Sequence, residues 1–482
     1  MRKTTEMLTG VIINKNKQKV SFVVEGFKFI FVNTEDCLEG VSLIPDSAGY
    51  LWGEIKNLSG NRTIAIYIGN SIVVRTTTVL NAWNYIVMNS RFQINDEGTV
   101  DFPGFQGIRF TKGTLMSVNP CWALHEDPDK EKELNIEMQK EQEPQDFWYI
   151  VHRAYSDKKE FNVDIEGHAV KWIFKSDISG HMSVDKGSSL ENTKSRLDVR
   201  FDSNCDLRVF YNYYGYVSAL LSFLTFRREV WFENIYLLYP DQYGYVEFAE
   251  CYVKNELDYW ADEREKQQED DDRIRSSMNS LTIQRLTDES FVRIIRNTMK
   301  VKKKETDLPF TVIPRNRKDA EIMTPDKIRS ICSSLELEMD AAGIKLSRDD
   351  EFQKLIDNVI NMIKDHRDSG INPLPDKTYQ HMFKSISYWG DSLADRAILA
   401  WHDNEHLLLP WLKMLAVTVN DEDIAAVVAV RHGITHRGFK ELDEKVSTTA
   451  YVLMGLIMVL ALKRVAVEDE VIKDLMLRQF IG

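Results

Sequence analysis

The chain has 482 residues, a formal net charge of −13 and 43% hydrophobic residues. This length predicts two to four domains, and the composition excludes an intrinsically disordered chain. The negative charge argues against a protein that coats nucleic acid passively, because such proteins are basic overall, but it allows an enzyme with a local basic cleft.

The first part of the chain predicts β-structure. Residues 10–14, 20–32, 63–75 and 83–88 are rich in β-branched and aromatic side chains, and short turn signals separate several of these runs. Gly69-Asn70 predicts a tight hairpin, and Glu25-Gly26 is a second candidate of the same kind.

Strand signals return at residues 161–175, with Glu166-Gly167 as the turn. Residues 197–214 predict a further strand pair, residues 216–230 a helix, and residues 234–240 one more strand. We therefore expect residues 1–250 to form a β-rich, sandwich-like or barrel-like part, whether as one domain or as two.

A charged stretch, residues 251–320, predicts a connector with helical parts. Helical signals begin at Thr324-Pro325, an N-cap followed by proline at the first helical position. Apolar residues at helical spacing then predict one helix at each of residues 328–339, 352–363, 423–433 and 447–465, and two helices within residues 385–412. Asp421 or Asp423 is the predicted cap of the helix at residues 423–433.

These signals predict an α+β multidomain protein. A β-rich N-terminal sandwich-like domain is followed by a C-terminal all-α helix bundle over residues 321–482. The longest apolar run, residues 450–462, is too short to span a bilayer and predicts a buried helix.

The compartment is predicted from the N-terminus and from the cysteines. The N-terminal MRKTTEMLTG lacks the apolar stretch of a signal peptide. The cysteines are scattered and odd in number, which predicts free thiols in a reducing compartment. We expect a cytoplasmic protein that does not associate with a membrane.

One segment, RHGITHRG at residues 431–438, has the residue types of a catalytic site. RNA cleavage without a metal requires a base for the 2′-hydroxyl proton, an acid for the leaving 5′-oxygen, and positive charge at the phosphorane. His436 can serve as the acid or the base near neutral pH, and Arg431 remains protonated and fits phosphate oxygens. His432 is predicted to contact substrate or to support the site. Arg437 and Lys440 are candidates for further phosphate contacts, with solvated surface residues as the alternative.

The spacing of the two main residues raises a geometric question. Five residues of continuous helix turn by about 500°, which would point Arg431 and His436 roughly 140° apart. Gly433 and Gly438 weaken the helix, so we expect it to end or bend inside the segment. One histidine in each chain does not easily serve as both acid and base, and a homodimer with two opposed copies of His436 would divide the roles.

The R-x4-H spacing of Arg431 and His436, after one apolar helix and before another, resembles the signature of HEPN ribonucleases. The chain length, the domain order and the segment YVSALLSFLTF resemble the ApeA-type anti-phage HEPN branch. The resemblance implies a metal-independent endoribonuclease that needs no cofactor, acts as a homodimer, and cleaves RNA in abortive infection, with tRNA as a candidate substrate. The N-terminal domain would then sense a phage-derived trigger.

Three alternatives remain open at this stage. Arg431 could pair with a carboxylate and His436 could be an ordinary surface histidine. The bundle could be a non-catalytic module that binds RNA, a nucleotide or a protein. His402 and His406 are four residues apart and could share a helix face as two metal ligands, but their spacing does not match HExxH and no third ligand is evident.

Overall fold

The computed structural model divides the chain into two compact units, Met1–Val301 and Lys302–Gly482. It describes residues 7–119, 158–254, 280–299, 312–314, 319 and 322–479, except 15, 35–38, 57–61, 90–91, 93–99, 166–167, 184–186, 229, 243, 347–349, 372, 388–391 and 438–441. Of residues 176–194, 387, 432–437 and 478–479 only the backbone is described.

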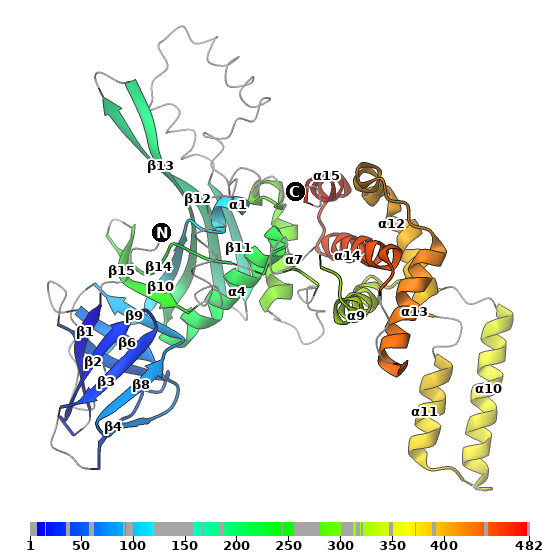
Figure 1. Ribbon diagram of the computed structural model, residues 1–482, viewed down its shortest axis with the longest axis horizontal. Coiled ribbons are helices and arrows are strands. Elements are labelled where there is room, and N and C mark those ends of the chain that lie inside the picture. The colour runs from blue at the N-terminus through cyan, green and yellow to red at the C-terminus, as the bar shows by residue number, and fades with distance from the viewer. Residues whose placement is uncertain are drawn as a thin grey trace. The chain divides into compact units, whose positions relative to one another are not determined.

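The first unit is built on antiparallel sheet and the second on helices, which confirms the predicted α+β fold class (Figure 1). The boundary between the units lies inside the stretch predicted as a connector.

The strands of the first unit are β1 (Leu8–Ile13), β2 (Lys19–Glu25), β3 (Lys28–Asn33), β4 (Val41–Leu43), β5 (Tyr50–Ile55), β6 (Arg62–Tyr67), β7 (Ile72–Val74), β8 (Thr77–Asn81), β9 (Asn84–Met88), β10 (Phe105–Thr111), β11 (Lys159–Ile165), β12 (His168–Ser183), β13 (Gly187–Cys205), β14 (Asn234–Asp241) and β15 (Gly244–Val253). Thirteen of them form one sheet in the order β11-β12-β13-β10-β14-β15-β9-β6-β5-β1-β2-β3-β8, and β4 pairs with β7. The predicted sandwich-like domain is therefore built on one continuous sheet.

The strands β1 to β9 enclose one hydrophobic core. Burial alternates along β1 and β2, so that every second side chain points inward. Phe22, Phe29, Phe31 and Tyr85 lie in this core with exposed fractions of 1% or less, and the rings of Phe29 and Tyr85 meet edge to face at 5.4 Å. This aromatic packing explains why segments rich in phenylalanine and β-branched residues fold as strands.

The hairpin predictions at Glu25-Gly26 and Gly69-Asn70 had opposite outcomes. The hairpin at Glu25-Gly26 is confirmed, because β2 and β3 pair up to Glu25 and Lys28. The hairpin at Gly69-Asn70 was wrong, since β6 pairs with β5 and β9 whereas β7 pairs with β4. The backbone N–H groups of Ile68 and Gly69 donate to Gly49 O at 3.0 and 3.2 Å, so the turn directs the chain to a separate small sheet.

The predicted strand pair at residues 197–214 is half wrong. Residues up to Cys205 belong to β13, but α4 (Leu207–Thr225) begins two residues later. Asp206 caps this helix by accepting a hydrogen bond from Arg208 N at 2.8 Å. The buried Phe210, Tyr213 and Val217 follow helical spacing, so the cap and the periodicity outweigh the strand propensity of the aromatic residues.

Helical segments cover one face of β11 to β13. The short α1 (Leu115–Val118) contacts β13 and α4, and α7 (Asp288–Met299) contacts β11 and α4. Phe291 of α7 stacks on Phe161 at 3.8 Å between ring centroids and meets Trp172 at 5.9 Å. Part of the predicted connector is therefore integrated into the first unit through aromatic packing.

The helices of the second unit are α9 (Pro325–Ala341), α10 (Asp350–Ser369), α11 (Asp376–Ser387), α12 (Leu393–Leu415), α13 (Asp421–Arg437), α14 (Glu444–Arg464) and α15 (Asp469–Gln479). The predicted cap of α9 is confirmed, because Thr324 Oγ1 accepts a hydrogen bond from Lys327 N at 3.2 Å. The sequence interpretation did not include α15 as a separate helix.

The helix α14 forms the centre of the bundle. Its side chains from Ala450 to Leu462 except Tyr451 are buried, as expected for a helix that is apolar on all sides. Among the described residues, α14 alone has the length and composition that could cross a membrane, and 72% of its most apolar window is buried within the structure.

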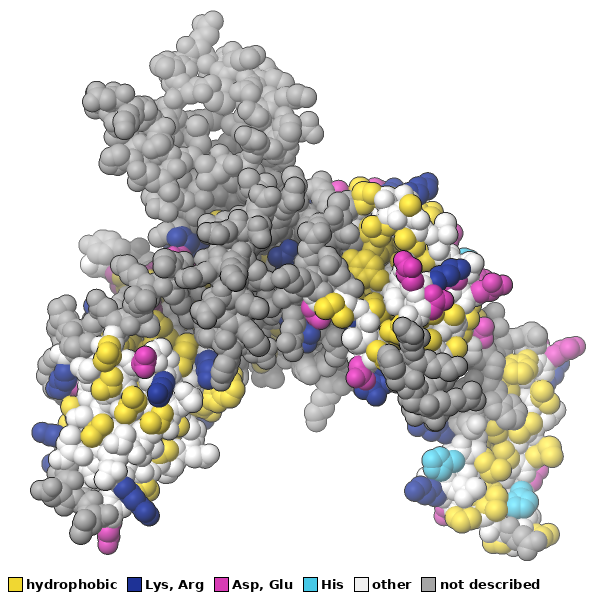
Figure 2. Space-filling view, viewed as in Figure 1, with side chains coloured by type: hydrophobic (Ala, Val, Ile, Leu, Met, Phe, Trp, Pro, Cys, Tyr) yellow, Lys and Arg dark blue, Asp and Glu magenta, His cyan; other side chains and the backbone are white. Residues whose placement is uncertain are grey.

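The helices α10 and α11 pack against each other as a hairpin. Of the apolar residues predicted to mark one face of α10, only Ile356 is buried, and Leu355 is half exposed. Figure 2 shows hydrophobic side chains along this hairpin, and Met362 and Ile371 are among the most exposed apolar residues of the chain.

Candidate functional site

The RHGITHR segment lies in the last two turns of α13. This helix begins with reciprocal hydrogen bonds, because Asn420 Oδ1 accepts from Asp423 N at 3.0 Å and Asp423 Oδ2 accepts from Asn420 N at 3.1 Å. The cap is therefore Asn420, and the prediction of Asp421 or Asp423 was wrong. Contacts with α9, α12 and α14 hold the helix in the bundle.

The helix does not end at Gly433, one of the two outcomes that we expected, since α13 continues to Arg437. A glycine inside a helix costs only about 1 kcal/mol relative to alanine, and tertiary packing readily offsets this amount. Arg431 and His436 consequently occupy positions roughly 140° apart on the helix. The two histidine positions, 432 and 436, are four residues apart and share one face.

Within the RHGITHR segment, Arg431 is the residue whose side chain the structure describes. Its Nη1 donates to Glu336 Oε2 of α9 at 3.0 Å. The side chains of Arg431 and Glu336 are 26% and 39% exposed, so both reach solvent. The predictions for His432, His436 and Arg437 concern side chains outside the described part of the structure, and Lys440 lies wholly outside it.

Three carboxylates of α9 bind three arginines from other helices. Glu336 pairs with Arg431 of α13, Glu338 with Arg464 of α14, and Asp340 with Arg396 of α12. The Glu338–Arg464 pair is bidentate, at 2.9 and 2.8 Å, and Glu338 is only 1% exposed. Burial raises the pKa of Glu338, although Arg464 opposes the rise.

The ion pair of Arg431 is more open than the pair beside it. Both members of the Arg431–Glu336 pair are partly solvated, whereas Glu338 is enclosed. An anion from solvent could therefore compete with Glu336 for the guanidinium group at a small cost in free energy. No local sequence pattern points to Glu336 as the partner, because 95 positions separate it from Arg431.

A buried thiol lies close to this pair. Burial raises the pKa of Cys332 to about 11, an effect that Glu336 reinforces and Arg431 opposes. The thiol is therefore protonated near neutral pH and is not an activated nucleophile.

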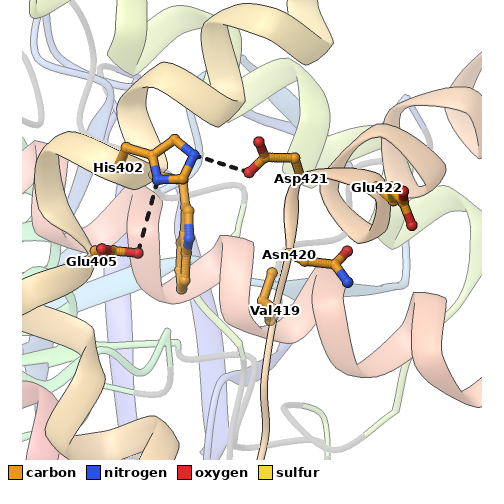
Figure 3. Close-up of a pocket in the computed structure, with 7 residues that line it drawn as sticks. His402, Glu405, Val419, Asn420, Asp421 and Glu422 are labelled. Carbon is orange, nitrogen blue, oxygen red and sulfur yellow. Dashed lines mark hydrogen bonds and ion pairs between the residues drawn. The ribbon is translucent and has the colours of Figure 1, made fainter.

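A separate pocket of about 430 Å³ lies between α12 and the start of α13 (Figure 3). Its lining residues are Trp401, His402, Glu405, Val419, Asn420, Asp421 and Glu422. His402 Nε2 lies 2.9 Å from Asp421 Oδ1, and Nδ1 lies 3.9 Å from Glu405 Oε2. Carboxylates therefore lie near both ring nitrogens, the two atoms through which a histidine binds a metal.

The metal-binding alternative required His402 and His406 to act together. His406 Nε2 lies 4.0 Å from Asp469 Oδ2 of α15, so the two histidines face different carboxylates. Among the described residues, no group of three or more histidine, cysteine, aspartate or glutamate side chains could hold a metal ion.

Comparisons with protein-family models, with curated proteins and with solved structures found no match for this chain. The resemblance to HEPN ribonucleases therefore rests on the residues of α13 and on the order of the two parts of the chain.

Proposed function

We propose that this chain is a metal-independent endoribonuclease of the HEPN type, similar to the ApeA branch of anti-phage proteins. The proposal rests mainly on the position, the exposure and the ion pair of Arg431. This arginine stands at the R-x4-H position of a bundle helix, is partly exposed, and makes an ion pair that an incoming phosphate can replace.

The proposed chemistry assigns charge and proton transfer to separate residues. Arg431 stabilises the negative charge of the phosphorane, because a guanidinium group remains protonated and donates two parallel hydrogen bonds to phosphate oxygens. His436 exchanges protons with the 2′-hydroxyl or the 5′-oxygen, and Arg437 and Lys440 contact neighbouring phosphates.

The shared face of positions 432 and 436 allows a more specific assignment. His432, which we first expected to contact substrate or to support the site, becomes a candidate partner acid or base within the same chain. The homodimer remains the other arrangement that supplies two histidines to one phosphate. Alanine substitutions at the two positions distinguish these arrangements, because the single-chain site requires both histidines and the dimeric site requires only His436.

The proposed biological role is cytoplasmic anti-phage defence by abortive infection. RNA, with tRNA as the first class to test, is the substrate, and a phage-derived trigger releases the nuclease. The β-rich unit is the sensing part, and no membrane is involved. A phage-challenge assay tests this role: cells that express wild type should stop phage replication, and cells that express His436→Ala should not.

The ion pair itself favours a second candidate function, a non-catalytic module that binds RNA, a nucleotide or a protein. A permanent Arg431–Glu336 pair would make the arginine a structural residue. The substitution Glu336→Gln separates the two functions. If Arg431 serves an RNA phosphate, freeing it should raise the cleavage rate severalfold; if the pair is only structural, the cleavage rate should stay unchanged.

The direct test uses purified protein, total bacterial RNA and extract from phage-infected cells as the source of trigger, with and without EDTA. We expect cleavage that EDTA does not suppress and products that end in 2′,3′-cyclic phosphate. Arg431→Ala should lose about 100-fold or more in rate, the range typical of a lost transition-state donor. Cleavage abolished by EDTA, or unchanged in Arg431→Ala, would refute the proposed site.

A further inference from the structure

The described strands of the large sheet end at β11 on one side and at β8 on the other. The edge strand β11 carries the charged residues Lys159, Glu160 and Asp164, and α7 packs against it. Charged side chains and a covering helix are common means of keeping an edge strand from pairing with another chain. The sequence of β8, TTVLN, contains neither a charged residue nor a proline. The edge at β8 therefore lacks the protection by charge that β11 has.

The strand β8 pairs with β3 along one of its sides. At one end of this pairing, Asn33 N donates to Thr76 O at 2.9 Å. At the other end, Ala82 N donates to Phe27 O at 2.9 Å. Because alternate residues of an antiparallel strand bond to the same neighbour, the even-numbered residues of β8 bond to β3.

Three residues of β8 consequently turn their backbone groups outward. Thr77, Val79 and Asn81 have odd numbers, so their N–H and C=O groups point away from β3. Among the described residues, none forms a backbone hydrogen bond with these groups. All three residues are exposed, Val79 to 54%. The edge thus presents donors and acceptors at every second residue, the pattern to which an added strand can bind.

The outer face of the sheet beside β8 is apolar. Val79 lies directly opposite Ile30 of β3, and Ile30 lies opposite Val23 of β2. Strand alternation places Ile30 and Val32 on this outer face, because Phe31 between them lies in the core. A strand added at β8 would extend the apolar face if it carried an aliphatic residue opposite Val79.

Two exposed basic residues flank the edge. Lys28 lies directly opposite Asn81 at one end of β8, and Arg75 lies two residues before Thr77 at the other end. Neither side chain forms an ion pair with a described residue, although Glu25 faces Lys28 across the hairpin of β2 and β3. Acidic side chains on an added strand would therefore complement both ends of the edge.

The same charges disfavour a second copy of this chain as the added strand. Two β8 strands paired antiparallel about Val79 would bring together Lys28 and Arg75 of both copies, and the TTVLN segment supplies no carboxylate to compensate them. A strand of different sequence fits the edge better.

We propose that β8 binds an extended peptide segment of another protein as an additional antiparallel strand. The segment has an aliphatic residue opposite Val79 and acidic residues two positions to either side of it. Hydrogen bonds to the backbone of Thr77, Val79 and Asn81 provide affinity, and the aliphatic and acidic side chains provide selectivity. This binding does not depend on whether the bundle cleaves RNA.

The test uses the full-length protein and the capped, fluorescein-labelled peptide TETVTET. Fluorescence anisotropy should show binding with a dissociation constant below about 1 mM. The peptide TKTVTKT has the same pattern with the opposite charge, and it should bind at least about tenfold more weakly. Failure of TETVTET to bind, or equal affinity for both peptides, would overturn the proposal.

Methylation of single peptide nitrogens tests the strand pairing itself. Methylation at the central valine removes the N–H group that donates to Val79 O, so the affinity should fall at least about tenfold. Methylation at the next threonine removes an N–H group that points away from β8, and it is the matched control. Equal losses for the two methylated peptides would show that the peptide does not bind as a strand.

Protein variants assign the binding to β8. Val79→Pro removes the outward N–H group and keeps the ladder with β3, because proline is tolerated at an edge position whose N–H faces solvent. Both Val79→Pro and Lys28→Glu should weaken binding of TETVTET at least about tenfold. Lys159→Glu makes the same charge change on β11 and should leave the affinity unchanged. Unchanged affinity in Val79→Pro and Lys28→Glu would overturn the assignment.

Sedimentation equilibrium of wild type and Val79→Pro tests the second copy as the occupant. We expect the same mass for both proteins. A lower mass for Val79→Pro, together with no binding of TETVTET to wild type, would assign the edge to a second copy and overturn the proposal.

Discussion

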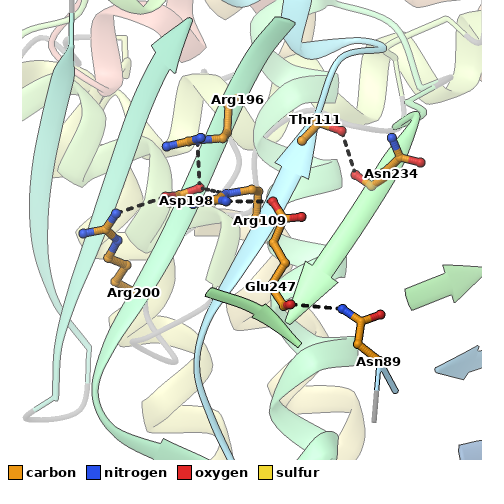
Figure 4. Close-up of polar contacts among 8 residues, drawn as sticks. All are labelled: Asn89, Arg109, Thr111, Arg196, Asp198, Arg200, Asn234 and Glu247. Atoms are coloured by element: carbon orange, nitrogen blue, oxygen red, sulfur yellow. Dashed lines mark hydrogen bonds and ion pairs between the residues drawn. The ribbon is translucent and has the colours of Figure 1, made fainter. Parts of the chain in front are cut away.

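Two arginine–carboxylate pairs, one in each unit, have the same chemistry and opposite surroundings. Arg109 and Asp198 form a bidentate pair in the middle of a sheet (Figure 4), where Asp198 has no exposure to solvent. Arg431 and Glu336 form an ion pair at 3.0 Å between two helices, with 26% and 39% of their side chains exposed. The same two functional groups therefore form a fixed pair in one place and an exchangeable pair in the other.

The difference follows from the cost of separating the two charges. A buried charge left without its partner destabilises the fold by several kcal/mol, whereas an exposed ion pair contributes at most about 1 kcal/mol. The sheet pair cannot open to admit a ligand, and Arg196 and Arg200 lie 3.3 and 3.1 Å from the same carboxylate of Asp198. The Arg431–Glu336 ion pair between the helices can open, and Arg431 must be able to leave Glu336 if it is to bind a phosphate.

The largest stability effect is expected at Asp198. Asp198→Ala leaves three guanidinium groups around an empty position and should lower the free energy of unfolding by about 3–5 kcal/mol. Asp202→Ala, on the same strand but with a side chain 46% exposed, is the control and should cost less than about 0.5 kcal/mol. Urea unfolding monitored by tryptophan fluorescence measures both, and equal effects would show that Asp198 is not part of a buried network.

The pH dependence of stability should differ in sign between two buried carboxylates. The arginines lower the pKa of Asp198 against the effect of burial, so its contribution is complete above its unfolded pKa of about 3.9 and is lost as the pH falls through the folded value. Burial raises the pKa of Glu338 in the bundle, so its contribution is complete below about pH 4.3 and is lost as the pH rises through the folded value.

Unfolding free energies of wild type, Asp198→Asn and Glu338→Gln from pH 3 to pH 8 test these signs. The difference between wild type and Asp198→Asn should shrink toward low pH. The difference between wild type and Glu338→Gln should shrink toward high pH. If both differences shrank toward the same end of the pH range, the opposite pKa shifts of Asp198 and Glu338 would be contradicted.

A smaller effect is expected at the start of α13. Asn420→Ala removes one half of the reciprocal cap and should cost about 1 kcal/mol of stability. Val419→Ala, one position earlier, is the control. Amide hydrogen exchange in the first turn of α13 should accelerate in Asn420→Ala alone; equal exchange in both variants would mean that Asn420 does not cap the helix.

The sequence predicted those features that depend on neighbouring residues. The hairpin at Glu25-Gly26, the cap at Thr324 and the buried α14 follow from local turn chemistry and from apolar periodicity. The Gly69-Asn70 turn and the helical residues after Asp206 were predicted wrongly, because distant hydrogen bonds and a side-chain cap outweighed propensity.

The polar networks could not be predicted, because their members are far apart in the sequence. Arg431 and Glu336 are 95 positions apart, and Arg109 and Glu247 are 138 apart. A single sequence carries no signal that joins such residues. The spacing of Arg431 and His436 was visible from the start, but the uninterrupted helix, which places positions 432 and 436 on one face, was not expected.

The most direct test of the proposed nuclease compares two histidines of the bundle. His436→Ala removes the proposed acid or base, and His402→Ala removes a histidine that pairs with Asp421 in the separate pocket. In the presence of EDTA and the phage extract, we expect His436→Ala to cleave RNA about 100-fold or more slowly than wild type, and His402→Ala to cleave at the wild-type rate. Normal cleavage by His436→Ala, or equal losses in both variants, would contradict the assignment of the site to α13.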